Sequence, residues 1–308
     1  MRKCSIRPAA VAKTILLGDT SALMDPKHTL TGDIRPHPQF ESRILGNRRD
    51  VLVYLPRGYR RARRRRYPVL YLQDGQNVFD AATSFAGVEW GVDETTQRLL
   101  RRNLIEPLII VAIANTGDDR IHEYTPTPGA IFESALEEKR SRGEAKKYGQ
   151  FLLEELKPSI DQEYRTKPEA EFTGLGGSSM GGLLTLSLGL SFPDFFHRLM
   201  VMSPAVWWDD EVILRVIGRL DYKPPLRIWL DTGTNESGWE RARKLRDQLV
   251  EKGWRLADDL AYFEAKGADH NEAAWGQRVE AALRFLYPPR SRRRRGRAPQ
   301  PLLLAAER

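Results

Sequence analysis

Apolar residues along this chain occur in two alternating patterns. One is the short continuous run that is typical of a strand buried on both faces, at 68–72, 107–114, 197–202, 226–231 and 259–263. The other is helical spacing, which predicts helices over 90–103, 151–160, 183–190, 209–220, 239–252 and 272–286. Strands and helices that alternate over this length predict one doubly wound α/β domain with a mainly parallel sheet.

Two further segments refine this prediction. Residues 40–45 and 49–55 are strand-like runs joined by Gly46-Asn47, a pair typical of a hairpin. Residues 115–147 hold no clear element, and a connection of this length is usually functional or mobile. Within the helix predicted over 151–160, Pro158 is expected to start a new turn or to kink the helix.

The two ends of the chain differ from its middle. Residues 1–38 lack sustained periodicity and carry several prolines, so we expect an N-terminal extension there. The regular alternation of strands and helices places one α/β domain at 39–287. Residues 288–308 are basic and of low complexity and are expected to form a disordered tail.

A glycine-rich stretch near the middle of the chain carries the strongest chemical signal. Gly177, Ser179 and Gly181 spell G-x-S-x-G, the pattern that places a serine on a sharp turn between a strand and a helix. Residues 171–173 resemble a short strand before this turn, and a leucine-rich helix closed by Pro193 follows it. The glycines suit a turn whose strained backbone leaves no room for a Cβ. We therefore interpret Ser179 as an exposed nucleophile.

The formal charge of +8 suggests a nucleic-acid partner until the basic residues are located. Residues 60–66 contain six arginines and residues 290–297 contain six more. Without these twelve arginines the formal charge of the chain becomes −4. The positive charge thus belongs to one loop and one tail, where blocks of like charge are usually solvated. No recognition motif surrounds them, so we expect no specific nucleic-acid partner.

Several other classes of protein are disfavoured by residue types. No apolar run approaches the roughly 18–20 residues of a membrane span, and the N-terminus is a poor secretory signal, so we expect a cytoplasmic protein. The single cysteine, Cys4, excludes an internal disulfide and a cysteine-based metal site. The five histidines are scattered and no nucleotide-binding glycine motif follows a strand. We therefore expect neither a metal nor another cofactor at the site.

A nucleophilic serine needs a base, and the base needs an acid that orients it. In an open α/β sheet these groups gather beyond the carboxyl ends of the strands. Among the histidines, His270 alone follows a late strand and precedes a helix, which makes it the candidate base. Asp231 and Glu236, which follow the strand at 226–231, compete as the acid. We prefer Glu236 because its loop can turn back toward His270, and we keep Asp231 as the alternative.

The remaining roles are donors for the oxyanion and contacts for the substrate. The residue after the nucleophile, Met180, is expected to offer its N–H to the oxyanion. Gln76, in the turn after the strand at 68–72, is the candidate for the second donor. Four aromatic residues in loops could contact a substrate, although packing is the commoner role of such residues: Trp90, Tyr124, Trp207 and Trp208.

Several spaced motifs resemble the esterase D-like putative esterase family. The run at 51–80 is similar to the opening of that family, and Gly-Ser-Ser-Met-Gly-Gly at 177–182 to its nucleophile motif. Asp-Thr-Gly-Thr-Asn-Glu at 231–236 and His-Asn-Glu-Ala-Ala-Trp at 270–275 are similar to its later signatures. The resemblance spans about residues 39–287 and implies an α/β-hydrolase fold. It also favours Glu236 over Asp231 and Gln76 as an oxyanion donor.

The sequence and the resemblance together imply a serine carboxylic-ester hydrolase. Its substrate would be a small-molecule ester, hydrolysed through a Ser179–His270–Glu236 triad and an acyl-enzyme. Family relatives include feruloyl, acetyl-xylan and siderophore esterases. Two alternatives stay open, namely acyl transfer to an acceptor other than water and an inactive hydrolase fold that serves in binding.

Overall fold

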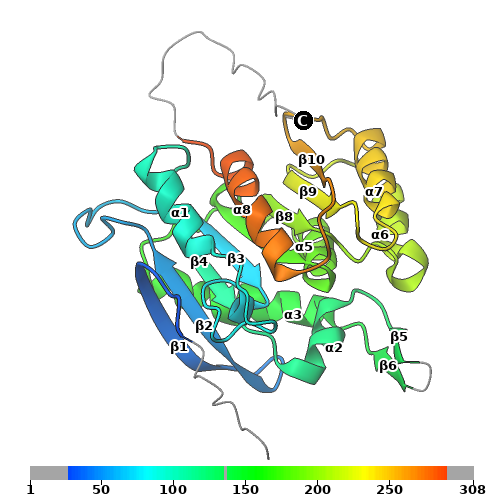
Figure 1. Ribbon diagram of the computed structural model, residues 1–308, viewed down its shortest axis with the longest axis horizontal. Helices are drawn as coiled ribbons and strands as arrows, with labels where there is room; N and C mark the ends of the chain where they lie inside the picture. Colours follow the sequence, from blue (N-terminus) through cyan, green and yellow to red (C-terminus); the bar gives the residue numbers. More distant parts are fainter. Residues whose placement is uncertain (1–26, 135–136, 290–308) are drawn as a thin grey trace, which may run out of the picture.

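The computed structural model describes residues 27–134 and 137–289, which form a layered α/β domain (Figure 1). Its strands are β1 Asp33–Ser42, β2 Asn47–Leu55, β3 Val69–Gln73, β4 Ile109–Ile113, β5 Gly129–Ser134, β6 Glu137–Ser141, β7 Thr173–Ser178, β8 Arg198–Met202, β9 Arg227–Gly233 and β10 Leu260–Ala265. Its α-helices are α1 Val92–Arg101, α2 Arg120–Tyr124, α3 Ala145–Phe151, α4 Lys157–Glu163, α5 Met180–Ser191, α6 Trp208–Gly218, α7 Glu240–Glu251 and α8 Glu272–Leu286.

The central sheet has the strand order β1-β2-β4-β3-β7-β8-β9-β10. β1 pairs antiparallel with β2, and β2 antiparallel with β4, whereas every later pair, from β4–β3 to β9–β10, is parallel. The carboxyl ends of the parallel strands therefore meet at one edge, where ligands bind in open α/β sheets. This is the α/β-hydrolase fold that the sequence predicts.

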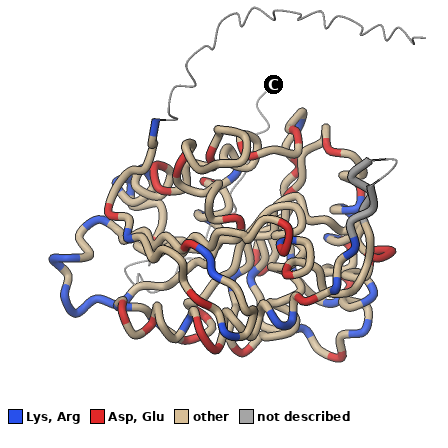
Figure 2. Tube along the Cα trace, turned by 90° about the horizontal axis from the view of Figure 1, so that it is seen from below, with Lys and Arg blue, Asp and Glu red and all other residues tan. Residues whose placement is uncertain are grey.

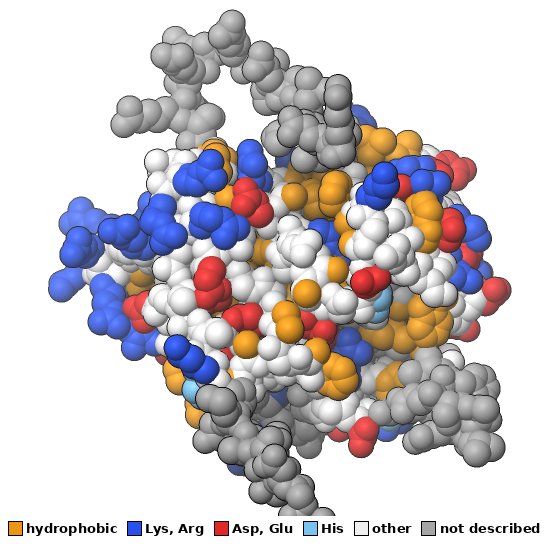
Figure 3. Space-filling view, in the orientation of Figure 1, with side chains coloured by type: hydrophobic (Ala, Val, Ile, Leu, Met, Phe, Trp, Pro, Cys, Tyr) orange, Lys and Arg blue, Asp and Glu red, His pale blue; other side chains and the backbone are white. Residues whose placement is uncertain are grey.

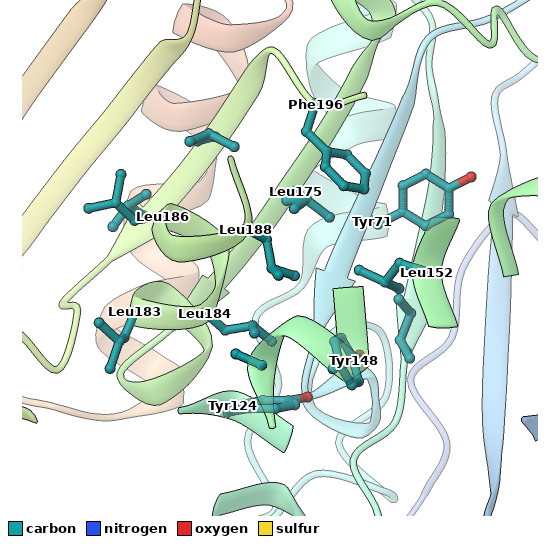
Figure 4. Packing of buried hydrophobic residues seen from close by; sticks show 14 of the residues in the cluster. Tyr71, Tyr124, Tyr148, Leu152, Leu175, Leu183, Leu184, Leu186, Leu188 and Phe196 are labelled. Carbon is teal, nitrogen blue, oxygen red and sulfur yellow. The ribbon is translucent and has the colours of Figure 1, made fainter. Parts of the chain in front are cut away.

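Apolar side chains alternate along the strands and fill two cores, one on each face of the sheet. On one face, Val69 and Tyr71 of β3 pack with residues of α3 to α7. On the other, Leu70 and Leu72 pack with α1 and α8. Figure 4 shows the first core, in which leucines of α5 lie against Leu175 of β7. Strands buried on both faces explain the continuous apolar runs in the sequence.

The N-terminal strand begins earlier than the hairpin pattern predicted. β1 starts at Asp33, inside the segment 1–38 that lacks periodicity, and it contains Pro36 and Pro38. Proline cannot donate to a sheet ladder, but β1 lies at the sheet edge, where one side needs no partner. The ladder also shifts between His37 and Phe40. This irregularity hides the strand from a search for alternating residues.

The stretch 115–147, predicted to lack clear elements, contains the short helix α2 and the antiparallel pair β5–β6. The following helical segment is continuous, because a π-helical stretch, Leu152–Leu156, joins α3 to α4. The π-helical turn stands just before Pro158, whose ring and missing N–H disturb the α-helical ladder. The kink predicted at this proline thus takes the form of a locally wider helix.

The strand before the nucleophile is shifted relative to the prediction. Residues 170–172 form a 3₁₀ turn, and the glycine-rich stretch itself is strand β7. A Cβ on Gly174 would lie 2.4 Å from the Tyr287 hydroxyl, and one on Gly176 would lie 2.6 Å from Leu72. These two glycines are therefore required by close packing on both sides of the strand.

The later helices agree with the prediction except at the start of α6. α6 includes Asp209, Asp210 and Glu211 in left-handed conformations, so its regular part starts only after them. α7 ends as predicted, with Gly253 at φ 99° directly after the C-cap residue Lys252. α8 occupies the residues that were predicted for the closing helix.

The arginine-rich loop at 60–66, between β2 and β3, extends from the body of the domain (Figure 2). Blue side chains also gather over this region in the space-filling view (Figure 3). Across the described residues, none of the helices combines the length and apolar character needed to span a membrane. Cys4, the arginines at 290–297 and most of the predicted tail lie outside the described residues.

Candidate active site

Ser179 lies between the end of β7 and the start of α5, on a sharply strained turn. Its φ of 56° and ψ of −121° are rarely adopted by residues with a side chain. Its N–H donates to the Met202 carbonyl at 3.0 Å, and its carbonyl accepts from the Ala205 N–H at 3.0 Å. A Cβ on Gly177 would lie 2.7 Å from the Gly181 backbone. The motif glycines are thus what allows this turn, as the sequence predicted.

His270 and Glu236 are in direct contact. His270 Nδ1 lies 2.9 Å from Glu236 Oε2, although the two residues come from the turns after β10 and β9. The imidazole is partly exposed, whereas Glu236 is buried. A cavity of about 40 Å³ beside them is lined in part by Ala205 and Trp207. The Ala205 N–H also donates to the Ser179 carbonyl. Ser179, His270 and Glu236 therefore all lie beside the loop that follows β8.

The second oxygen of Glu236 is held by three donors. Oε1 accepts from the Ser203 hydroxyl at 2.6 Å and from the Gly233 N–H at 2.7 Å, and Arg278 Nη2 lies 3.6 Å away. Burial alone would raise the pKa of Glu236, but its bonds with His270, Ser203 and Gly233 outweigh burial and lower the pKa below its usual value. Glu236 is therefore ionised at neutral pH.

The alternative acid, Asp231, is engaged elsewhere. It is fully buried, and its carboxylate accepts from Trp229 Nε1 at 2.6 Å and forms an ion pair with Arg278 Nη1 at 3.0 Å. Burial raises the pKa of Asp231 to about 6, although the positive charge of Arg278 acts in the opposite direction. Of the two competing acids, Glu236 is thus the one that contacts the imidazole.

The turn after β3 lies beside the serine turn. Asp74 is buried with φ 54°, and its carboxylate binds Arg120 through two contacts of 2.7 Å. Its Oδ2 would lie 3.4 Å from a Cβ placed on Gly181. Gln76 follows in a 3₁₀ turn, and its side-chain oxygen accepts from the Asn115 N–H at 3.2 Å. Within the described chain, the N–H groups of Gln76 and Met180 donate to no other group.

Of the four aromatic residues predicted to contact a substrate, only Trp207 has an exposed ring. It is 44% exposed, whereas Trp90, Tyr124 and Trp208 are at most 2% exposed. Trp90 packs against Trp275, and the Tyr124 hydroxyl accepts from the Asp74 N–H. Packing, the commoner role of such residues, is thus what the structure shows for these three. Trp207 alone remains a candidate for substrate contact.

The residue patterns in the sequence did not predict the buried hydrogen-bond network that holds Glu236. Ser203 Oγ donates to Glu236 and accepts from Trp275 Nε1 at 3.0 Å and Arg278 Nη2 at 3.1 Å. The Trp275 ring in turn contacts His270 edge-on, with centroids 4.9 Å apart. One signal was available in the sequence, because Arg278 falls on the apolar face of α8 and a buried arginine needs an acidic partner.

Metal-ligating side chains are grouped elsewhere. Within residues 27–134 and 137–289, the group of carboxylates spaced to hold an ion consists of Glu89, Asp93 and Glu94. These residues belong to the start of α1 and not to the turns that carry Ser179, Glu236 and His270. The chemistry available at the serine turn is therefore that of a hydroxyl, an imidazole, a carboxylate and backbone N–H groups.

Fold and residue types define the class of an α/β-hydrolase, and comparison with known proteins gives the family. The family model described as "putative esterase" matches residues 42–286, so the chain belongs to that family and is a carboxylic ester hydrolase. A ferri-bacillibactin esterase of Bacillus subtilis is 29% identical over 246 residues, 72% of this chain and 80% of that protein. An endo-1,4-beta-xylanase/feruloyl esterase of Xylanibacter ruminicola is 26% identical over 80% of this chain but only 30% of its own length.

Solved structures support the fold. The enterobactin esterase of Shigella flexneri superimposes with a TM-score of 0.65 at 21% identity, over 85% of this chain and 61% of that chain. At this identity the likeness concerns the fold alone.

Proposed function

We propose that this esterase acts through a covalent acyl-enzyme formed on Ser179. Ser179 Oγ attacks the carbonyl carbon of the ester while His270 Nε2 accepts the hydroxyl proton. The tetrahedral intermediate expels the alcohol, which leaves with the proton held by His270. Water then attacks the acyl-enzyme, with His270 again accepting and returning a proton, and the carboxylic acid is released.

The observation that carries this proposal is the 2.9 Å contact between His270 Nδ1 and Glu236 Oε2. It commits one ring nitrogen to the carboxylate and leaves Nε2 for proton exchange with the serine. The lowered pKa of Glu236 keeps the carboxylate charged at neutral pH, where it stabilises the imidazolium that forms during attack. The bonds from Ser203 and Gly233 fix the orientation of that carboxylate.

The oxyanion would be held by the N–H groups of Met180 and Gln76. Both are without an acceptor in the described chain, and Met180 is the first residue of α5. A helix N-terminus carries partial positive charge, which favours the developing oxyanion. The bidentate pair between Arg120 and Asp74 fixes the turn that presents Gln76.

We further propose that the substrate is an ester with an aromatic acyl group. The exposed Trp207 ring lines the cavity beside His270, where it could stack on such a group. The feruloyl esterase among the relatives acts on an aromatic acyl ester by its name. The Shigella enterobactin esterase was also solved with 2,3-dihydroxy-N-benzoyl-serine, whose aromatic group is attached through an amide, so this ligand supports an aromatic group near the ester and not an aromatic acyl ester itself.

The direct test is turnover of p-nitrophenyl acetate by single variants. Ser179→Ala and His270→Ala should each lower kcat by on the order of 10⁴-fold or more, because triad residues act as a unit. Ser191→Ala, an exposed serine at the end of α5, is the matched control and should keep full activity. Substantial turnover by Ser179→Ala would contradict the acyl-enzyme mechanism.

The acyl group is tested separately. Methyl ferulate and methyl 2,3-dihydroxybenzoate should be hydrolysed with higher kcat/KM than methyl butyrate. A preference for the aliphatic ester would contradict the substrate proposal while leaving the triad intact. Formation of a new ester when an alcohol is added would instead identify acyl transfer.

A further inference from the structure

Three carboxylates gather at the N-terminal end of α1, away from the serine turn. Asp93 and Glu94 stand in the first turn of this helix, and Glu89 precedes them in the connecting loop. One oxygen from each of the three lies within 4.8 Å of the others. Acidic residues in a first helical turn usually interact with the helix dipole. That role does not require three side chains to converge on one point.

Each of the three carboxylates also has one buried oxygen without a hydrogen-bond partner in the described chain. Glu89 Oε2, Asp93 Oδ1 and Glu94 Oε2 are all inaccessible to solvent and unbonded in the described chain. Asp93 is fully buried, with 0% exposure. Its other oxygen, Oδ2, accepts from the Thr31 N–H at 2.7 Å and from the Thr31 hydroxyl at 2.9 Å. Asp93 is therefore held through Oδ2, whereas Oδ1 is left without a partner in the described chain.

Glu89 is arranged in the same way. Its Oε1 accepts from the Thr29 hydroxyl, and its Oε2 is the unbonded oxygen. Thr29 is itself fixed, because its N–H donates to Asp80 at 3.0 Å and its hydroxyl accepts from the Ala81 N–H at 2.8 Å. The segment before β1 thus orients two of the three carboxylates toward a common point.

No positive side chain in the described part of the chain pairs with this cluster. Among the described residues, no lysine, arginine or histidine forms an ion pair with Glu89, Asp93 or Glu94. A buried carboxylate without a partner is costly, and three carboxylates side by side also repel one another. A bound cation, or a proton held between two of the carboxylates, would remove this cost.

We propose that Glu89, Asp93 and Glu94 bind a divalent cation that prefers oxygen ligands, with Ca²⁺ favoured over Mg²⁺. Ca²⁺ binds oxygen at about 2.3–2.6 Å, so two ligands of one ion can lie up to about 5 Å apart. The three carboxylate oxygens all lie within that separation of one another. Mg²⁺ requires a stricter geometry, keeps several of its waters and is usually held by one or two carboxylates, so three buried carboxylates suit Ca²⁺ better.

The bound ion would stabilise one wall of the active site. Trp90, which follows Glu89 in the chain, packs against Trp275 with ring centroids 6.0 Å apart. Trp275 in turn contacts the His270 ring, with centroids 4.9 Å apart. The N–H of Trp90 also donates to the Asn77 carbonyl at 2.9 Å, next to Gln76. The ion would thus be structural, joining the chain before β1 to the loop that leads into α1.

A shared proton is the competing occupant. Burial raises the pKa of Asp93 to about 8, and the neighbouring charge of Glu94 acts in the same direction. A proton held between Asp93 and Glu94 would also relieve the repulsion, without any metal. The two occupants differ in their response to added cation and to pH.

The test uses the full chain, treated with EDTA and transferred to metal-free buffer. Tb³⁺, a luminescent substitute for Ca²⁺, is titrated while tryptophan is excited, since Trp90 adjoins the site. We expect saturable luminescence that Ca²⁺ displaces more effectively than Mg²⁺, and a Tm that rises with Ca²⁺. Glu89→Gln and Glu94→Gln should each weaken the binding of Tb³⁺ by about tenfold or more. Neither readout uses esterase activity, so the result is independent of the proposed function.

Glu240→Gln is the matched control, because Glu240 is also an acid in a first helical turn but is exposed on α7. It should bind Tb³⁺ like the wild type. Equal loss in this control, or no luminescence in the wild type, would overturn the proposal. The proposal would also be overturned if Ca²⁺ left the Tm of the wild type unchanged while mild acidification raised the Tm of the wild type but not that of Asp93→Asn. If Asp93→Asn fails to fold, Glu94→Gln provides the same comparison.

Discussion

Replacing Arg278 with methionine removes the positive charge that joins the two acids behind the active site. Arg278 is 3% exposed, and its Nη1 lies 3.0 Å from Asp231 Oδ1. Its Nη2 donates to Ser203 Oγ at 3.1 Å, and its Nε donates to the Ala274 carbonyl at 3.1 Å. Methionine keeps most of the length and apolar contact of the side chain. The substitution therefore tests the charge and its bonds, with little change in volume.

The expected loss of stability is large, because Asp231 would remain buried without its counter-ion. Breaking a buried ion pair from one side typically costs about 3–5 kcal/mol. The remaining donors to Asp231, Trp229 Nε1 and the Ser203 N–H, offset only part of this cost. Arg278→Met should thus lower the free energy of unfolding by about 3–5 kcal/mol.

The assay is urea unfolding at neutral pH, followed by tryptophan fluorescence. Asp231→Asn combined with Arg278→Met should be more stable than the sum of the single effects predicts, by about 1–3 kcal/mol, because no uncompensated charge remains. Arg284→Met is the matched control on the same helix, where Arg284 is partly exposed and lies 3.8 Å from Glu280. Its effect should stay within about 0.5 kcal/mol.

A loss below about 1 kcal/mol in Arg278→Met would refute this reasoning. Strict additivity in the double variant would refute it as well, because it would mean that Arg278 and Asp231 do not depend on each other. Similar losses in Arg278→Met and Arg284→Met would point to the helix and not to the buried network.

Three further predictions concern the site itself. Ser179→Gly should be more stable to urea than Ser179→Ala by about 1 kcal/mol, because glycine relieves the strained φ of 56°; equal stability would contradict the strain. Glu236→Gln should lower kcat by about 10²–10⁴-fold. Folding lowers the pKa of Glu236, so the ionised carboxylate stabilises the folded protein above about pH 4.3, and this stabilisation is lost as the pH falls through the folded-state pKa. The difference in free energy of unfolding between wild type and Glu236→Gln should therefore shrink when urea melts are repeated in acid. Trp207→Ala should raise KM for aromatic esters several-fold while Tm and kcat stay unchanged, and an unchanged KM would remove Trp207 from the substrate site.

Much of the fold could be predicted from the sequence because its signals are local. Continuous apolar runs mark strands that are buried on both faces, and helical spacing marks α7 and α8. The failures have physical causes. β1 is an edge strand with prolines and a register shift, and β7 consists largely of glycines that close packing requires. Such requirements come from neighbours distant in the sequence, so no local pattern reveals them.

The candidate site residues that follow the ends of strands could be predicted from the sequence. Ser179, Glu236 and His270 follow β7, β9 and β10, and topology alone directs them to one edge of the sheet. The network of Ser203 and Arg278 was not predicted, because its members come from separate elements and meet only in three dimensions. Three of the four aromatic residues are buried, and hydrophobicity alone does not tell which of them pack and which stay exposed.

The central claim is that Ser179 is the nucleophile, and covalent labelling tests it most directly. The wild-type protein is treated with a fluorophosphonate, and the modified peptide is identified by mass spectrometry. The account predicts one adduct per chain, on Ser179, and no adduct in Ser179→Ala. An adduct on the neighbouring Ser178 or on Ser203, or none at all, would contradict it.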